Sequence, residues 1–143
     1  MDKQKKMHEL EVLAAQIRVE TMKIIGARGF GHVGGSMSMA DAMAVVYGAY
    51  MKIDPKNPRW EDRDWFVMSK GHAGPAMYAT LVIMGYYPVS DAYKLNQPGT
   101  DFPSHTDRNK TRGVDLTTGS LGQGISEAVG AALGLKMQKK DNK

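Results

Sequence analysis

The sequence contains no cysteine, which excludes disulfide frameworks and thiolate metal sites. It also contains no apolar run close to the roughly 18 consecutive residues that a membrane-spanning helix needs. The first ten residues, MDKQKKMHEL, are charged but lack the apolar stretch of a secretory signal. Together these absences predict a cytoplasmic protein without a membrane partner.

A basic surface for nucleic acid is also missing, although the formal net charge is +4. The excess charge lies at the two ends, where residues 1–6 hold three lysines and one aspartate, and residues 136–143 hold four lysines and one aspartate. No aromatic residues interleave with these lysines, as they do in surfaces that bind single-stranded nucleic acid. We therefore attribute the charge to solvated chain ends and expect no nucleic-acid partner.

The composition, 42% hydrophobic and 24% charged, is that of one globular domain covering residues 1–143. Apolar spacing and flanking glycines predict helices over residues 7–27, 39–51, 76–84, 90–95 and 125–137. Strand-like runs lie at residues 65–69 and 114–116. Ser38 followed by Asp41 indicates a capping box, and Gly130 and Gly134 indicate close packing of the last helix on a sheet. This alternation predicts an α/β layered domain with a mainly parallel sheet and flanking helices.

Three of the four histidines, His32, His72 and His105, lie in turns that contain glycine or proline, where α/β folds present ligand groups. Converging imidazoles could bind a phosphorylated or polyhydroxylated substrate and move a proton near neutral pH. The alternative is that each histidine bonds only to nearby backbone. A zinc site is disfavoured, because the three are 40 and 33 residues apart and no H-x-x-x-H pair occurs.

The run from Gly119 to Gly124, GSLGQG, precedes the last expected helix. Backbone N–H groups at such a place can bind an anion. The glycine order is G-x-x-G-x-G, which differs from the dinucleotide signature, and no Lys-Ser/Thr pair follows, so the Walker signature is absent too. The run therefore indicates either a ligand loop or a tight structural turn, and its residues leave both open.

Three segments in family order resemble the thiamine-diphosphate-binding domain of transketolase, especially its split or N-terminal-subunit form. They are GHVGGSMSMADA, DRDWFVMSKGHAGPAMYATL and PSHTDRNKTRGVDLTTGSLGQGISEAVGAALGLK. The resemblance runs from about Leu10 to Lys136. It departs from the commonest pattern at Val33 and Thr106, where many members have proline, and we expect both departures to affect loop stiffness more than chemistry.

The resemblance implies transfer of a two-carbon ketol unit from a ketose phosphate to an aldose phosphate, with thiamine diphosphate and Mg²⁺ as cofactors. It implies that His32 and His105 face the hydroxyls and carbonyl of the sugar substrate. It implies that His72 contacts the cofactor diphosphate. The loop residues that it places on the cofactor's aminopyrimidine ring are Gly119, Ser120 and Leu121.

Other parts of the family site have no counterpart in this sequence. The family continues past the last expected helix into a strand ending in G-D-G and then an asparagine, which hold the metal and the diphosphate. The glutamate that activates the aminopyrimidine belongs to another domain, across a dimer interface. We therefore expect no metal ligand here and an incomplete domain that is inactive alone. Its expected partners are the remainder of the domain and a C-terminal transketolase subunit or domain, in a homo-oligomer or hetero-oligomer. The alternative is a non-catalytic accessory or degenerate chain that keeps the fold for protein association.

Overall fold

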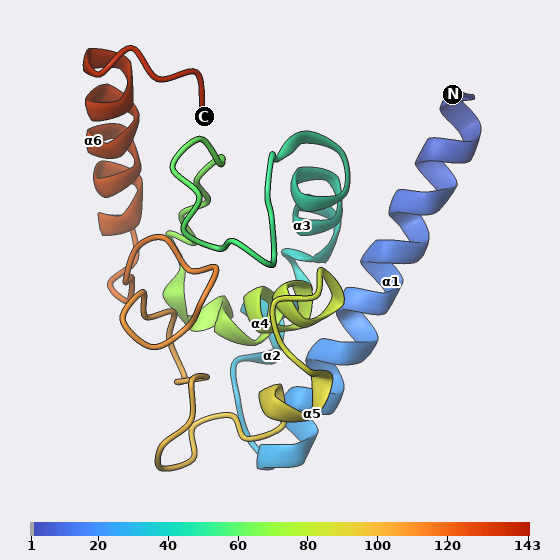
Figure 1. The fold of residues 1–143 in the computed structure, drawn as a ribbon. Helices are drawn as coiled ribbons and strands as arrows, with labels where there is room; N and C mark the ends of the chain where they lie inside the picture. Colours follow the sequence, from blue (N-terminus) through green and yellow to red (C-terminus); the bar gives the residue numbers. More distant parts are fainter. Residues whose placement is uncertain (1) are drawn as a thin grey trace.

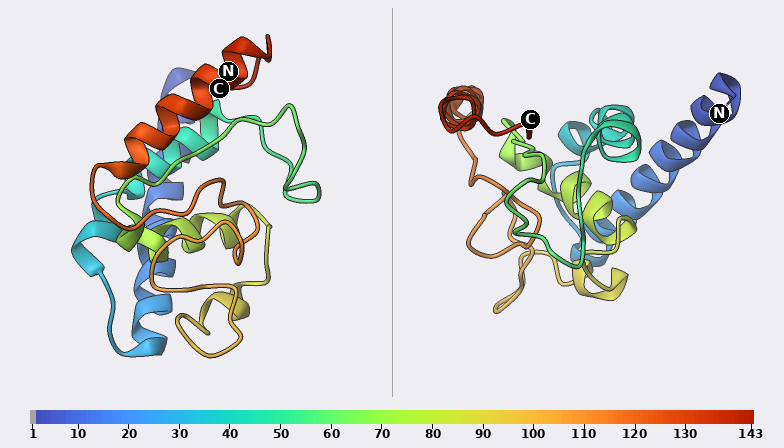
Figure 2. Two further views of the ribbon diagram at one scale, coloured as in Figure 1. Left: turned by 90° about the vertical axis from the view of Figure 1, so that its left-hand side faces the viewer. Right: turned by 45° about the horizontal axis from the view of Figure 1, so that its top comes forward.

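The computed structural model describes residues 2–143 (Figure 1). Its elements are, in chain order, α1 (Lys3–Arg28), α2 (Val33–Met37), α3 (Ala40–Val45), the π-helical turn η1 (Val46–Tyr50), the 3-10 turn η2 (Gly71–Ala73), α4 (Gly74–Ile83), α5 (Val89–Ala92) and α6 (Gln123–Met137). Helices α1 and α6 lie on opposite sides of the fold, with α4 between them (Figures 1 and 2). No helix in this part of the chain is long and apolar enough to cross a membrane.

Helix α1 has a sequence signal at each end. The carboxylate of Asp2 accepts from the amide of Gln4 at 3.1 Å and so caps the first turn. Gly29 ends the helix with a φ of +85°, a left-handed conformation that glycine adopts without strain. Ile17 and Ile24 on the inner face are fully buried, and the helix packs on α3 and α4. The helix expected over residues 7–27 is confirmed, with an earlier start.

The core centres on α4, which is buried along almost its whole length. Pro75 stands in its first turn, where a missing amide hydrogen costs nothing. The ring of Tyr78 packs edge-on against Phe102 with centroids 5.2 Å apart, and its hydroxyl donates to the carbonyl of Pro103 at 2.8 Å. This bond anchors the loop that carries His105 to the most buried helix.

The expected parallel sheet is not formed, since no residue between 2 and 143 lies in a strand. The segments expected as strands, residues 65–69 and 114–116, are joined through side chains instead. The amide of Phe66 donates to the carboxylate of Asp115 at 2.9 Å, and the Thr118 hydroxyl donates to the carbonyl of Met68. A parallel ladder needs the backbone of one strand to bond to the backbone of its neighbour. Here the Phe66 amide and the Met68 carbonyl bond to side chains, and the Trp65 amide donates to the carbonyl of Lys143 at 2.7 Å, so no backbone ladder links residues 65–69 to 114–116.

The expected capping box at Ser38 and Asp41 is also wrong. Ser38 ends α2, and α3 follows Met39 without any side-chain cap. The Ser38 hydroxyl accepts from the ammonium of Lys70 at 2.7 Å and donates to the carbonyl of Gly35 at 3.2 Å. These two bonds take the hydroxyl away from the start of α3, and the helix expected over residues 39–51 is divided between α3 and η1.

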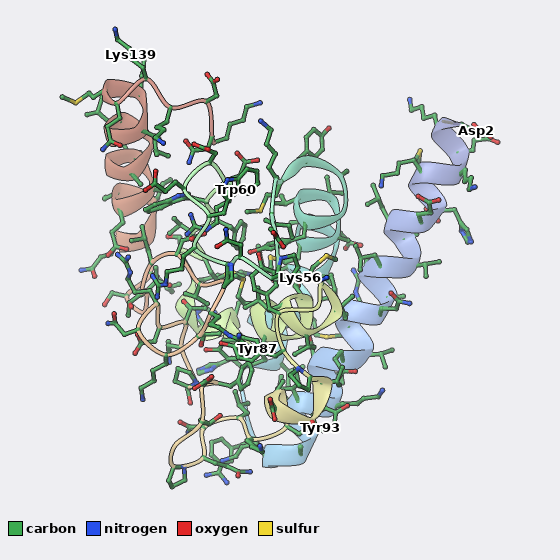
Figure 3. All side chains as sticks on the ribbon, in the orientation of Figure 1. Asp2, Lys56, Trp60, Tyr87, Tyr93 and Lys139 are labelled. Carbon is green, nitrogen blue, oxygen red and sulfur yellow. The ribbon has the colours of Figure 1, made fainter. Side chains whose placement is uncertain are left out.

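Helix α6 confirms the helix expected over residues 125–137, but its packing differs from the expectation. A Cβ at Gly130 or Gly134 would meet nothing within 4 Å, so neither glycine marks a close contact. Gly124 is the one buried residue of the helix. Four large apolar side chains are exposed along it, namely Ile125, Val129, Leu133 and Met137. Side chains project from α6 away from the rest of the fold (Figure 3).

Candidate active site

Three histidines that are distant in sequence come together in the structure. The ring of His32 lies 5.3 Å from that of His72 and 5.3 Å from that of His105, measured between centroids. His32 immediately precedes α2, His72 lies within η2, and His105 lies in the loop after Pro103. His32 and His105 are exposed and His72 is half-buried, so the cluster is open to a ligand. The convergence that the sequence left open is therefore present.

A glycine of α2 allows His72 to take its place. A Cβ added at Gly35 would lie 2.5 Å from the Nε2 atom of His72, closer than real Cβ contacts come. A Cβ at the neighbouring Gly34 would meet nothing within 4 Å. The two adjacent glycines of the GHVGGS segment, Gly34 and Gly35, therefore differ, and Gly35 is the one that lies against the imidazole.

Two buried threonines lie beneath the cluster and join its loops. The Thr106 hydroxyl shares a hydrogen bond of 2.9 Å with the Thr118 hydroxyl. The Thr106 amide donates to the carbonyl of Gly71 at 3.2 Å, and the Thr118 amide donates to the carbonyl of Thr106 at 3.2 Å. A Cβ at Gly71 would lie 2.1 Å from the Thr118 carbonyl oxygen, so only glycine fits there. These contacts hold the neighbours of His72 and His105 against the start of the GSLGQG run.

The GSLGQG run forms a turn that leads into α6. Gly122 is the N-cap of α6, with a φ of +89° that favours glycine. Gly124 is buried, and a Cβ there would lie 2.7 Å from the Cα of Ser69. Gly119 has open space around it, and the Leu121 side chain is 72% exposed. The end of the run is therefore a structural turn, while Gly119, Ser120 and Leu121 are exposed and accessible to a ligand.

The electrostatics of the cluster favour an uncharged His72. Burial lowers the pKa of the His72 imidazole below its ordinary value, and His32, Lys70 and His105 lower that pKa further by charge repulsion. A neutral imidazole keeps one donor and one acceptor nitrogen at neutral pH. The cluster can therefore bind hydroxyls, carbonyls or an anion through hydrogen bonds, with the positive charge of Lys70 nearby.

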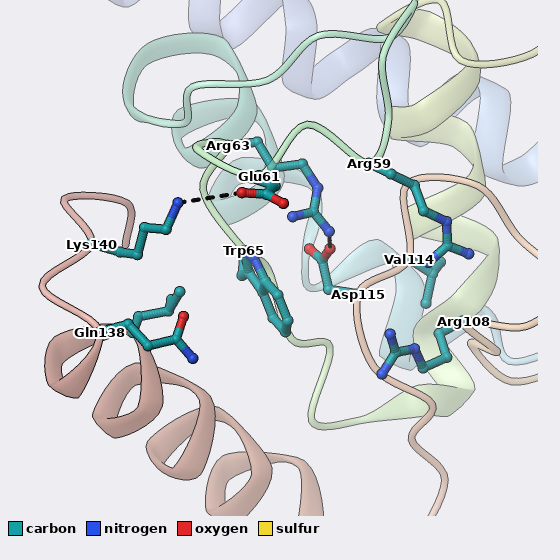
Figure 4. A pocket seen from close by; sticks show the side chains of 10 residues that line it. Arg59, Glu61, Arg63, Trp65, Arg108, Val114, Asp115, Gln138 and Lys140 are labelled. Atoms are coloured by element: carbon teal, nitrogen blue, oxygen red, sulfur yellow. Dashed lines mark hydrogen bonds and ion pairs between the residues drawn. The ribbon is translucent and has the colours of Figure 1, made fainter.

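A hollow of about 310 Å³ lies between residues 59–65, residues 108–115 and the end of α6 (Figure 4). Arg63 and Asp115 form a largely buried ion pair in it. Burial raises the pKa of Asp115, opposed by the Phe66 amide and by the charge of Arg63. Lys140 pairs with Asp62 at 3.1 Å, which ties the chain after α6 to this region. We interpret this hollow as structural rather than ligand-binding. Its ion pairs connect residues 59–65 to residues 108–115 and to the chain after α6.

Comparison with known proteins decides the family. The family model described as the transketolase thiamine diphosphate binding domain matches residues 10–143. The chain belongs to the transketolase family. It is 52% identical over 134 residues to the 6-deoxy-6-sulfo-D-fructose transketolase subunit SqwG of Clostridium sp. (strain MSTE9), covering 94% of this chain and 49% of that protein. It is 39% identical to transketolase 1 of Escherichia coli (strain K12), covering 91% of this chain and 20% of that protein.

Solved transketolase structures share the arrangement of this chain. The transketolase from Leishmania mexicana superposes with a TM-score of 0.82 at 42% sequence identity, over 86% of this chain and 18% of that protein. The chain thus spans about half the length of the SqwG subunit and about a fifth of the length of the other two transketolases. The family resemblance inferred from the sequence is confirmed. The fold corresponds to part of the transketolase thiamine-diphosphate-binding domain, without the expected sheet.

The residues of this transketolase chain fit thiamine diphosphate in their chemistry. His72 and Lys70 offer a hydrogen-bonding nitrogen and a positive charge for a diphosphate, and Leu121 offers an exposed apolar side chain for a flat ring. Among residues 2–143, no three histidine, aspartate or glutamate side chains are grouped so that they could hold a metal ion. The fit therefore concerns the organic cofactor.

Several residues that shape the site were not singled out from the sequence. Gly35, Lys70 and Thr118 act through contacts with segments far along the chain. The sequence signal for Gly35 and Lys70 was present, since both stand within the GHVGGS and SKGHA segments that carry the resemblance. Nothing in the sequence separates Gly35 from Gly34, because the difference lies in which of them faces His72.

Proposed function

We propose that this chain supplies the thiamine-diphosphate-binding part of a transketolase that transfers a two-carbon ketol unit between sugar phosphates. The observation that carries the proposal is the convergence of His32, His72 and His105, whose loops are joined to Thr118 just before the GSLGQG run. Isolated loop histidines that bond only to nearby backbone would have no need to bring the rings of His72 and His105 within 5.3 Å of that of His32. Family membership supports the same reaction class.

Each site residue has a proposed role that its environment supports. His72 is half-buried and its lowered pKa suits a neutral hydrogen-bonding partner for the diphosphate. His32 and His105 are exposed, as contacts to substrate hydroxyls and carbonyl require. The residues proposed to contact the aminopyrimidine are Gly119, Ser120 and Leu121. Thiamine diphosphate, when bound, supplies the electron sink for cleavage of the ketose carbon–carbon bond.

We propose that the Mg²⁺ ligands and the activating carboxylate lie outside this chain, in the rest of the domain and in a C-terminal transketolase subunit or domain. The share of the relatives that the chain covers supports this division. The exposed apolar side chains of α6 support association, because such a row on a helix is usually covered by another surface. A homo-oligomer and a hetero-oligomer are both compatible with that row. The cytoplasmic location expected from the sequence stays a prediction.

A sulfonated ketose is a second candidate substrate. The specific observation is the 52% identity to a subunit whose name states 6-deoxy-6-sulfo-D-fructose as its substrate, against 39% to E. coli transketolase 1. His32 and His105 would contact hydroxyls and a carbonyl, which phosphorylated and sulfonated sugars share. The choice between the two substrates therefore depends on residues that contact the anionic end of the sugar.

Reconstitution tests the proposal. The chain is mixed with the rest of a transketolase, thiamine diphosphate, Mg²⁺, an aldose phosphate acceptor, and either a ketose phosphate or a 6-sulfo ketose as donor. Mass spectrometry of the products detects two-carbon transfer. We expect this transfer only when the chain is present. Transfer that survives replacement of His32, His72 and His105 together would contradict the enzyme assignment and favour a non-catalytic accessory chain.

A further inference from the structure

We propose that Lys70 is a positioning residue of the histidine cluster, which fixes His72 against Gly35 and His32 through its hydrogen bond to Ser38. The inference deepens the proposed function, because it explains how this chain holds the residue assigned to the diphosphate. It stands on contacts among residues that are far apart in sequence.

The first contacts form a path from Lys70 to the glycine that touches His72. The Lys70 ammonium donates to the Ser38 hydroxyl at 2.7 Å. The same hydroxyl donates to the Gly35 carbonyl at 3.2 Å. Gly35 in turn leaves no room for a Cβ beside the Nε2 atom of His72. The Ser38 hydroxyl therefore connects Lys70 to Gly35, the residue against which the His72 imidazole packs.

The same contacts reach His32 through α2. His32 is the N-cap of α2 and Ser38 is its C-cap, so the lysine holds the far end of the helix that begins at His32. This helix has five residues, two of them glycine, and its N-cap side chain makes no capping hydrogen bond. So short and glycine-rich a helix has little stability of its own. Its position must therefore come from outside contacts, of which the Lys70 bond is one.

The backbone of Lys70 also controls the turn that carries His72. Lys70 is the N-cap of η2, and its carbonyl accepts from the Ala73 amide at 2.8 Å. The lysine thus closes a ring of contacts that runs from His32 through α2 and Ser38 to Lys70, and through η2 to His72. The two imidazoles complete the ring with their 5.3 Å approach. A lysine that merely extended into solvent would not close it.

The charge of Lys70 acts on His72 as well. After burial, the groups that lower the pKa of His72 are His32, Lys70 and His105. Removing the ammonium should therefore raise the His72 pKa towards its ordinary value, whereas removing only the Ser38 hydroxyl leaves the charge in place. The two effects of Lys70, its hydrogen bond and its charge, can consequently be separated by two substitutions.

The test is an NMR titration of the histidine Cε1–H signals, together with the backbone amide spectrum, of this chain without thiamine diphosphate. Lys70→Met should raise the His72 pKa and shift the Gly35 and His72 amide signals. Lys56→Met is the matched control, since it removes the same charge from an exposed side chain and should change neither. Ser38→Ala should shift the Gly35 and His72 amide signals while the His72 pKa stays below its ordinary value.

The proposal is overturned if the His72 titration in Lys70→Met equals that in Lys56→Met, or if Ser38→Ala leaves the Gly35 and His72 amide signals in place. Should Lys70→Met lose its fold by circular dichroism, Ser38→Ala and the charge-keeping Lys70→Arg decide the matter. Lys70→Arg is expected to keep the His72 pKa low. The NMR titration contains no cofactor, so its result on Lys70 does not depend on thiamine diphosphate binding. A chain that failed to bind thiamine diphosphate would contradict the proposed function and not the positioning role of Lys70.

Discussion

The backbone amide of Thr106 donates to the carbonyl of Gly71 at 3.2 Å, so one hydrogen bond joins the residue after His105 to the residue before His72. Proline at this position, common among family members by the sequence resemblance, could not donate that bond. The departure at Thr106, expected to affect loop stiffness more than chemistry, thus provides a contact between two parts of the site.

We expect Thr106→Pro to destabilise this chain by about 1–3 kcal/mol, because the Gly71 carbonyl loses its donor close to the buried threonine pair. Thr106→Val is the matched control. It keeps the amide and loses only the hydroxyl bond to Thr118, whose own hydroxyl still donates to Met68, so a smaller loss is expected. Urea unfolding measures both. Equal free energies of unfolding for the wild type and Thr106→Pro would show that the Gly71 bond is dispensable.

Substitutions at Gly35 and Gly34 test the close contact between Gly35 and the His72 ring. Gly35→Ala should displace the His72 ring, because the new Cβ would lie 2.5 Å from its Nε2 atom, and should be less stable than Gly34→Ala. Gly34→Ala adds the same methyl group to open space and should be neutral or stabilising, by up to about 1 kcal/mol, since alanine favours helix. The His72 ring signal in the NMR spectrum and urea unfolding distinguish them. Identical behaviour of the two variants would contradict the proposed contact.

The lowered pKa of His72 gives this chain a defined pH dependence. Above the ordinary histidine pKa of about 6.5, His72 is neutral in both folded and unfolded states and contributes nothing. As the pH falls below that value, the unfolded chain takes up the proton first, so the free energy of unfolding falls until the folded pKa is also passed. His72→Gln should remove this part of the pH dependence in unfolding experiments between pH 7.5 and 5. His8→Gln, on an exposed part of α1, should keep it, and the reverse pattern would contradict the account.

The exposed apolar side chains of α6 predict association that depends on concentration. Val129→Asp should shift light scattering towards the monomer, because a carboxylate at the centre of the row would be costly to bury. Val19→Asp makes the same change at a similarly exposed site on α1, at the opposite side of the fold, and should leave association unchanged. If the wild-type chain stays monomeric at high concentration, the proposal that α6 mediates self-association is wrong.

The helices could be predicted from the sequence because their signals are local. The apolar spacing of α1 and its ending at Gly29 are visible within the segment itself. The strands at residues 65–69 and 114–116 could not be settled in this way, because a strand requires the backbone of another segment as its partner. In the structure the Phe66 amide and the Met68 carbonyl bond to the side chains of Asp115 and Thr118 rather than to a neighbouring strand.

The site shows the same division between local and distant information. His32, His72 and His105 could be selected as candidates from their turns, but their approach depends on α2, η2 and the two threonines packing together. Ser38 matched a capping pattern, and the pattern gave the wrong partner because Lys70, from a distant segment, reaches the hydroxyl. Roles for the individual histidines stay predictions.

The most direct test of the central claim is a titration of the isotope-labelled chain with thiamine diphosphate and Mg²⁺, followed by amide NMR signals. We predict weak binding, since we place the metal ligands outside this chain, with shifts concentrated at His72 and at Gly119 to Leu121. His72→Ala should lose these shifts, and His105→Ala should keep them, because it is assigned to the substrate. Shifts that avoid both segments, or that His105→Ala abolishes and His72→Ala preserves, would contradict the assignment of this site to the cofactor.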